Sequence, residues 1–208
     1  MQTTNRRKRI TAAFAGLVFG LAWVVYAPTA SAGEGKPAAS AAQGTHCVIS
    51  VTTKAVDCFA TITESIAFAT GGRVTDAPSD VLTAVKDPDV TARINGGGPG
   101  ALAVIGIQYY LANYGSHSLT VNGPDVGCDG PVDPPEYFVA PLPNFVPSGG
   151  INWNNNIRSF QGYSGCWQAL FDDPGCTVRI YPTIPPWWGP FAADLGVAND
   201  RAECIYWS

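Results

Sequence analysis

Six cysteines constrain the fold of this chain more than any other sequence feature. They are Cys47, Cys58, Cys128, Cys166, Cys176 and Cys204. An even number of cysteines predicts disulfides in a chain that leaves the reducing cytosol. Zinc ligation is the competing interpretation, but the sequence has no C-x-x-C spacing, and its only histidines are His46 and His117. We therefore expect three disulfides, and spacing alone leaves their pairing open.

The first 32 residues predict export. Four cations at 6–9 precede an uncharged run at 10–28 and an A-x-A site at 30–32, which is the order found in a secretory signal peptide. A membrane anchor is the alternative, since about 19 apolar residues could just span a bilayer. Gly16, Gly20 and the small-residue site favour cleavage. We expect a signal peptide at 1–32, a flexible leader at 33–45, and a secreted, extracellular product without membrane attachment.

The expected product is acidic. Residues 33–208 contain eight Lys and Arg against sixteen Asp and Glu, so their net charge is −8. Phosphate contacts require a cationic surface. The charge therefore disfavours nucleic acid as a partner.

Residues 46–75 predict a small hairpin and helix module. β-branched residues on both sides of a polar centre predict a two-stranded hairpin closed by Cys47 and Cys58. Thr61 and Glu64 have the spacing of a helix capping box, and the glycines at 71–72 end the predicted short helix. The module is too small to bury a core alone, so we expect it to dock on the residues that follow.

Residues 76–100 predict a linker, because prolines and the glycine-rich run at 96–100 interrupt any periodicity. A phosphate-binding loop is the alternative, but the run lacks the Gly-Lys-Ser/Thr ending of a P-loop.

Beyond Ala101 the sequence pattern changes. Short apolar or aromatic runs alternate with Pro, Gly and Asn, which predicts an all-β sandwich or barrel; the runs are 102–110, 118–121, 137–139, 166–171 and 178–181.

The C-terminal half contains an internal repeat. The segment NNNIRSF at 154–160 recurs in altered form as NDRAECI at 199–205. An aromatic-led turn precedes each copy, at 109–116 and at 171–178. The first copy also carries a Pro-rich insertion around 131–147.

These two segments resemble the Greek-key motif of the βγ-crystallin family, which reads aromatic-x-x-x-x-aromatic-x-Gly and later N/D-N/D-x-x-S/T-S. Ser116 stands where the family has glycine; the matching residues are Tyr109, Tyr114, Asn154, Asn155, Ile157 and Ser159 in the first copy and Asn199 and Asp200 in the second. The resemblance covers about residues 101–208. It implies a mainly β, two-motif Greek-key sandwich, here preceded by the hairpin and the short helix.

The resemblance also implies the disulfide pairing. In the second copy Cys176 replaces the second aromatic and Cys204 replaces the final serine. These two positions face each other in the family, so one bridge would replace their contact. The implied set is Cys47–Cys58, Cys128–Cys166 and Cys176–Cys204.

Calcium-binding members of the family use Asn and Asp side chains, backbone carbonyls and the Ser/Thr at the fifth motif position. Arg158 occupies that position in the first copy, and because a guanidinium has no lone pair to donate, we expect that site to be lost. The second copy has Glu203 there, beside Asn199 and Asp200. Weak calcium binding at this one site is one interpretation, and simple Asx turns are the other.

The sequence offers little support for catalysis. No Gly-x-Ser-x-Gly motif occurs, and neither histidine has the partners of a Ser/His/Asp set. Asp172 and Asp173 could suggest a glycosidase pair, but adjacent residues of a strand point to opposite faces, so a turn is the better interpretation. We expect no enzyme.

A proline-stiffened aromatic loop at 185–191 is the predicted binding loop, with Trp187, Trp188 and Phe191 as its anchors. The alternative is that its tryptophans cap the sandwich, as we expect of Trp153 and Trp167. The resemblance extends to secreted bacterial metalloproteinase inhibitors and killer-toxin-like proteins. We therefore expect a monomeric, non-enzymatic binding protein whose partner is an extracellular protease or a cell-surface glycan. An extracellular structural or stress protein with vestigial calcium binding is the alternative.

Overall fold

The computed structural model describes residues 46–208 apart from 98–99, 125–127, 131–133, 143–150 and 185–187. All of these residues belong to one unit, which spans Ala39–Ser208. The predicted signal peptide at 1–32 and leader at 33–45 lie outside the described residues. None of the helices that the structure describes is long and apolar enough to cross a membrane.

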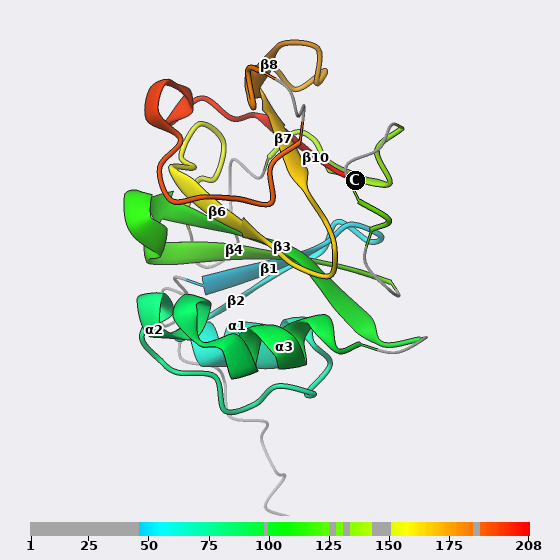
Figure 1. The fold of residues 1–208 in the computed structure, drawn as a ribbon, viewed down its shortest axis with the longest axis vertical. Helices are drawn as coiled ribbons and strands as arrows, with labels where there is room; N and C mark the ends of the chain where they lie inside the picture. Colours follow the sequence, from blue (N-terminus) through cyan, green and yellow to red (C-terminus); the bar gives the residue numbers. More distant parts are fainter. Residues whose placement is uncertain (1–45, 98–99, 125–127, 131–133, 143–150, 185–187) are drawn as a thin grey trace, which may run out of the picture. The chain divides into compact units, whose positions relative to one another are not determined.

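Two sheets make up most of the described chain (Figure 1). The six-stranded sheet has the order β2-β1-β4-β3-β6-β9, with β1 (His46–Ser50), β2 (Val56–Phe59), β3 (Leu102–Leu111), β4 (Gly115–Pro124), β6 (Ser159–Gly162) and β9 (Phe191–Ala192). The four-stranded sheet has the order β5-β10-β7-β8, with β5 (Tyr137–Val139), β7 (Gln168–Phe171), β8 (Arg179–Tyr181) and β10 (Cys204–Trp207). The short 3₁₀ turns are η1 (Ala112–Tyr114) and η2 (Gly196–Ala198).

The order of the strands repeats within the chain. β3, β4 and β6 lie in the six-stranded sheet while β5, between them in sequence, joins the other sheet. Likewise β7, β8 and β10 lie in the four-stranded sheet while β9 crosses to the first. In each set the last strand returns to pair with the first, β6 with β3 and β10 with β7, which is the Greek-key connection. The predicted mainly β architecture is confirmed.

The N-terminal hairpin is part of the larger sheet. β1 pairs antiparallel with β2, as predicted, and also pairs in parallel with β4, from His46 opposite Ser118 to Ser50 opposite Asn122. The hairpin therefore extends a four-stranded Greek-key sheet to six strands. Parallel pairing between strands this far apart in sequence has no local sequence signal. The sequence therefore predicted that the hairpin docks on the rest of the chain, but not that it does so by pairing β1 with β4.

Three helices cover the outer side of the six-stranded sheet (Figure 1). α1 (Ile62–Ala69) begins with the predicted capping box between Thr61 and Glu64. The predicted linker is wrong at α2 (Val81–Lys86) and α3 (Pro88–Asn95). Asp80 and Asp87 cap these helices, and Pro88 occupies the first turn of α3, where its missing N–H costs no hydrogen bond. The linker prediction failed because it treats Pro88 and the glycines at 96–100 as helix breakers, although Pro88 begins α3 and Gly96 ends it.

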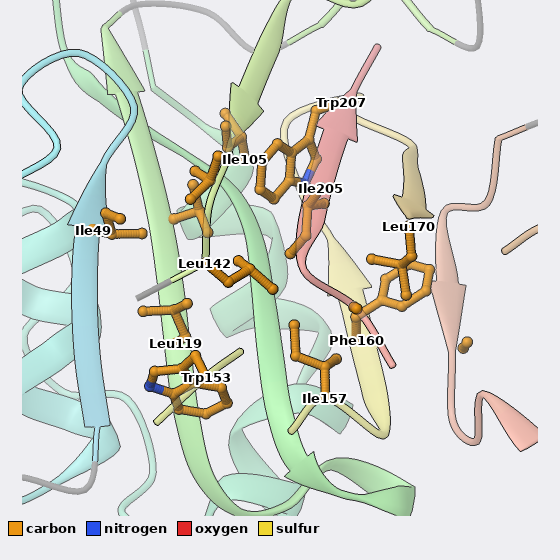
Figure 2. Close-up of a cluster of buried hydrophobic side chains, with 14 of the residues drawn as sticks. Ile49, Ile105, Leu119, Leu142, Trp153, Ile157, Phe160, Leu170, Ile205 and Trp207 are labelled. Atoms are coloured by element: carbon orange, nitrogen blue, oxygen red, sulfur yellow. The ribbon is translucent and has the colours of Figure 1, made fainter. Parts of the chain in front are cut away.

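The main core fills the space between the two sheets. Figure 2 shows Ile105 and Leu119 of the larger sheet in one buried cluster with Ile205 and Trp207 of the smaller sheet. Trp153 is fully buried in this core, as the sequence predicted. A second core joins the helices to the opposite face of the larger sheet through Val48, Ile66, Val90, Ile94, Val104 and Ile107. The larger sheet is thus buried on both faces.

The disulfide prediction is confirmed. The three bridges are Cys47–Cys58, Cys128–Cys166 and Cys176–Cys204. The first bridge closes the hairpin between β1 and β2. The second joins the segment after β4 to the segment before β7. Three disulfides indicate an oxidising environment for the folded chain.

Candidate functional site

The first motif is closed by stacked rings and by one serine. Tyr109 and Tyr114 lie edge to face with ring centroids 5.5 Å apart. The Ser159 hydroxyl accepts a hydrogen bond from the Tyr114 N–H (3.0 Å) and donates one to the Leu111 carbonyl (2.6 Å). The serine that ends the motif thus fastens the turn after β3.

The second motif replaces these contacts with a covalent bond. Cys176 stands at the position of Tyr114 and, like it, has a positive φ, 57° against 61°. Cys204 stands at the position of Ser159 and is fully buried in β10. The Cys176–Cys204 bridge therefore closes the second turn where the first uses hydrogen bonds.

The two Asn/Asp turns hold each other across an approximate two-fold relation. The Asn155 N–H donates to the Ala202 carbonyl (2.9 Å), and the Asp200 N–H donates to the Ile157 carbonyl (3.1 Å). Both Asn155 and Asp200 have a positive φ, which Asn and Asp tolerate better than other non-glycine residues. The backbone of the second residue in each motif thus binds the fourth residue of the other, and its side chain lies beside the fifth, Glu203 or Arg158.

At one of these contacts the chain supplies its own cation. Arg158 Nε lies 2.9 and 2.8 Å from the two carboxylate oxygens of Asp200, and its Nη2 lies 2.6 Å from Oδ2. The hydrogen bonds to Asp200 raise the pKa of Arg158. The ion pair is more than one third exposed, so solvent screens it and it contributes little to stability. Its chemical consequence is larger, because a carboxylate occupied by a guanidinium is not free for a metal ion.

Two of the three predicted calcium ligands have their carboxylates occupied by other side chains. Asp200 binds Arg158, and Glu203 Oε1 accepts from Asn155 Nδ2 (3.1 Å). Asn199 Nδ2 donates to Asp194 Oδ1 (2.9 Å), whereas the buried Asn199 Oδ1 has no hydrogen-bond partner among the described residues. The Gly196 N–H, and next Asn199, lower the pKa of Asp194. Among the described residues there is no group of three or more His, Cys, Asp or Glu placed to hold a metal ion. Weak calcium binding by Asn199, Asp200 and Glu203 remains a prediction.

The predicted binding loop divides into two parts, and its Trp187 lies outside the described residues. Trp188 is only 3% exposed and packs with Ala169, Phe171 and Cys204. The guanidinium carbon of Arg179 lies 5.4 Å from the Trp188 ring. The structure therefore corrects the proposed role of Trp188, which covers the outer face of the four-stranded sheet and is no free anchor. Phe191 is 57% exposed on β9, and its role as a binding anchor stays a prediction.

Sequence reasoning missed other apolar side chains beside Phe191. Val178, Ile184 and Val197 are large and exposed, and all lie in the loop that the Cys176–Cys204 bridge closes. The segment 178–192 also joins β8, the outermost strand of the smaller sheet, to β9, the outermost strand of the larger one. The sequence did not show which of these side chains would be exposed, since a single apolar residue between Pro and Gly has the same sequence pattern whether it is buried or exposed.

Comparison with known proteins gives one likeness of interest. No protein-family model and no curated protein sequence matches the chain. Among solved structures the chain is similar to a mutant βγ-crystallin domain from Clostridium beijerinckii, with 17% identity over 50% of this chain and 95% of that one, at a TM-score of 0.29. No residue role is transferred from that protein to this chain.

Proposed function

We propose that this chain is a secreted, non-enzymatic binding protein whose βγ-crystallin-like scaffold stands without calcium. Support for the binding role comes from the segment 178–197. Val178, Ile184, Phe191 and Val197 expose apolar surface there, on a loop fastened by a disulfide. A loop that is already held in place loses little conformational entropy on binding, which favours affinity.

The position of the segment favours an extended partner. β8 and β9 are edge strands of their sheets, and an edge strand can pair with a further strand on its outer side, although the Phe191 carbonyl of β9 already accepts a hydrogen bond from the Tyr181 hydroxyl (3.4 Å). Strand addition at a sheet edge gives affinity through backbone hydrogen bonds and specificity through neighbouring side chains. An extracellular protease, which binds extended chains in its cleft, fits this mode. The proposal is therefore a proteinase-inhibitor-like role, with a cell-surface glycan as the competing partner.

The test is inhibition of purified extracellular proteases, one of each mechanistic class, together with binding to a glycan array. We expect saturable inhibition of at least one protease. Phe191→Ala should weaken it at least about tenfold, because an aromatic anchor that becomes buried in an interface typically contributes about 2 kcal/mol or more. Leu82→Ala is the matched control, since Leu82 is an exposed apolar residue on α2 outside the segment.

Absence of inhibition together with glycan binding would replace the protease by a sugar ligand. If neither assay shows binding, the alternative function, that of an extracellular structural protein, takes precedence. That alternative is favoured by the three disulfides and by motif turns that the chain closes with its own side chains.

A further inference from the structure

A pocket of about 190 Å³ lies on the helix-covered side of the six-stranded sheet. It shares no residue with the segment 178–197. We call it the Asn122 pocket, and among its lining residues are Val48, Ala55, Asp57, Phe68, Leu102 and Asn122. It forms because α1 ends at Ala69, so the helix leaves this part of the sheet uncovered.

Most of the surface of the Asn122 pocket is apolar, although Ser50, Thr53 and Asp57 also line it. Phe68 of α1 and Leu102 of β3 line it and remain 46% and 42% exposed, while Val48 of β1 is buried. Two large apolar side chains that face one concavity are costly to leave in water, at roughly 25 cal/mol per Å² of apolar surface. An apolar ligand would remove that surface from water.

One buried polar group gives the pocket a direction. Asn122 lies on β4 between Ser50 and Val104 and is 4% exposed. Its Nδ2 donates to the Ala69 carbonyl at 3.4 Å, whereas its Oδ1 accepts no hydrogen bond from the described residues. Asn122 therefore offers a ligand a hydrogen-bond acceptor at the buried base of a pocket whose polar lining also includes Ser50, Thr53 and Asp57.

The size of the pocket limits the ligand to one ring system. An apolar cavity of about 150 Å³ holds benzene, whereas sites for drug-sized ligands begin at about 300 Å³. Asp57 in the lining disfavours an anionic ligand. We propose that the Asn122 pocket binds a neutral aromatic ring with one hydrogen-bond donor, of the phenol or indole class. The ring contacts Phe68, Leu102 and Val48, and its O–H or N–H donates to Asn122 Oδ1.

Titration of the ¹⁵N-labelled protein with phenol, indole and toluene, followed by NMR, tests the proposal. Phenol and indole should cause saturable shifts of the Val48, Phe68 and Asn122 amides and bind at least fivefold more tightly than toluene. Asn122→Leu should remove this preference while toluene still binds. Equal affinity for phenol and toluene in the unchanged protein, or shifts centred on other residues, would refute the proposal.

A second pair of variants keeps the test independent of the folding of Asn122→Leu. Leu102→Trp should fill the pocket and weaken phenol binding at least tenfold. Leu82→Trp should leave it unchanged, since Leu82 is equally exposed, at 39%, but lies outside the pocket. Loss in both variants, or in neither, contradicts the site. N-acetyltyrosinamide identifies the source of the ring. If it binds as phenol does, a tyrosine side chain of a peptide is the ligand, and if only phenol binds, a free small molecule is.

Discussion

Acidification destabilises this protein through His46, a buried imidazole at the start of β1. The side chain is only 8% exposed, and its Nδ1 lies 2.9 Å from the Ser118 hydroxyl. Burial, and next the neighbouring His117, lower the pKa of His46 from 6.5 to about 4, while Glu64 on α1 acts in the opposite direction. The folded state therefore holds this histidine neutral at pH values where the unfolded chain protonates it.

The sign and size of the effect follow from proton linkage. Above pH 6.5 His46 is neutral in both states and contributes no pH dependence. As the pH falls from 6.5 to 4 the unfolded state takes up the proton first, so stability is lost across this window. The loss amounts to about 1.4 kcal/mol at pH 5.5 and approaches about 3 kcal/mol below pH 4. Burial also lowers the pKa of His117, which adds to the loss with the same sign.

Urea unfolding at pH 7.5 and pH 5.5 measures this loss. The lower value stays above the range in which carboxylates with lowered pKa, such as Asp173 and Asp194, contribute. His46→Asn keeps a polar group near Ser118 but cannot titrate, so it should retain most of the stability that the unchanged protein loses. His117→Asn is the control and should retain less. An equal loss in His46→Asn and in the unchanged protein would refute the reasoning.

Three further predictions concern stability and processing. Arg73 donates hydrogen bonds to the backbone carbonyls of Thr70, Arg93, Ile94 and Leu102. Arg73→Leu should therefore lower the free energy of unfolding by about 2 kcal/mol in a denaturant titration. Arg73→Lys should recover only part of this loss, because an ammonium cannot span these acceptors. Gly106→Ala should cost about 1–3 kcal/mol by the same assay, since the new Cβ would lie 2.8 Å from the buried Trp207 Nε1; an unchanged midpoint would show that the tryptophan moves freely. N-terminal sequencing of the exported protein should begin at Gly33 or within a few residues of it, and an intact Met1 in a membrane fraction would refute the signal peptide.

Local sequence signals predicted the local structure well. The hairpin between Cys47 and Cys58, the capping box at Thr61 and the strands at 102–110 and 137–139 each depend on neighbouring residues, and all are present. The Cys176–Cys204 bridge was predicted because the resemblance to the βγ-crystallin motif implies that these two positions face each other. The resemblance thus supplied long-range information that the residues around either cysteine do not contain.

Long-range and environmental features could not be predicted in the same way. Nothing in the sequence of β1 identifies β4 as its parallel partner. Trp188 and Phe191 stand in one Pro- and Gly-rich stretch, yet one is buried beneath Arg179 and the other is exposed. For the Asn/Asp turns, the sequence showed that Arg158 removes a calcium ligand. It did not show that Arg158 reaches Asp200 of the other motif, because that contact depends on the packing of the two Greek keys.

Calcium titration tests most directly whether the chain closes its motif turns with its own side chains. Thermal unfolding is measured in excess calcium and in chelator, for the unchanged protein and for Arg158→Ser. Because Arg158 occupies Asp200, the midpoint of the unchanged protein should shift by less than about 1 °C. Arg158→Ser frees the Asp200 carboxylate and restores a hydroxyl at the fifth motif position, so calcium should raise its midpoint saturably. A saturable rise of several degrees in the unchanged protein, or none in Arg158→Ser, would contradict the account.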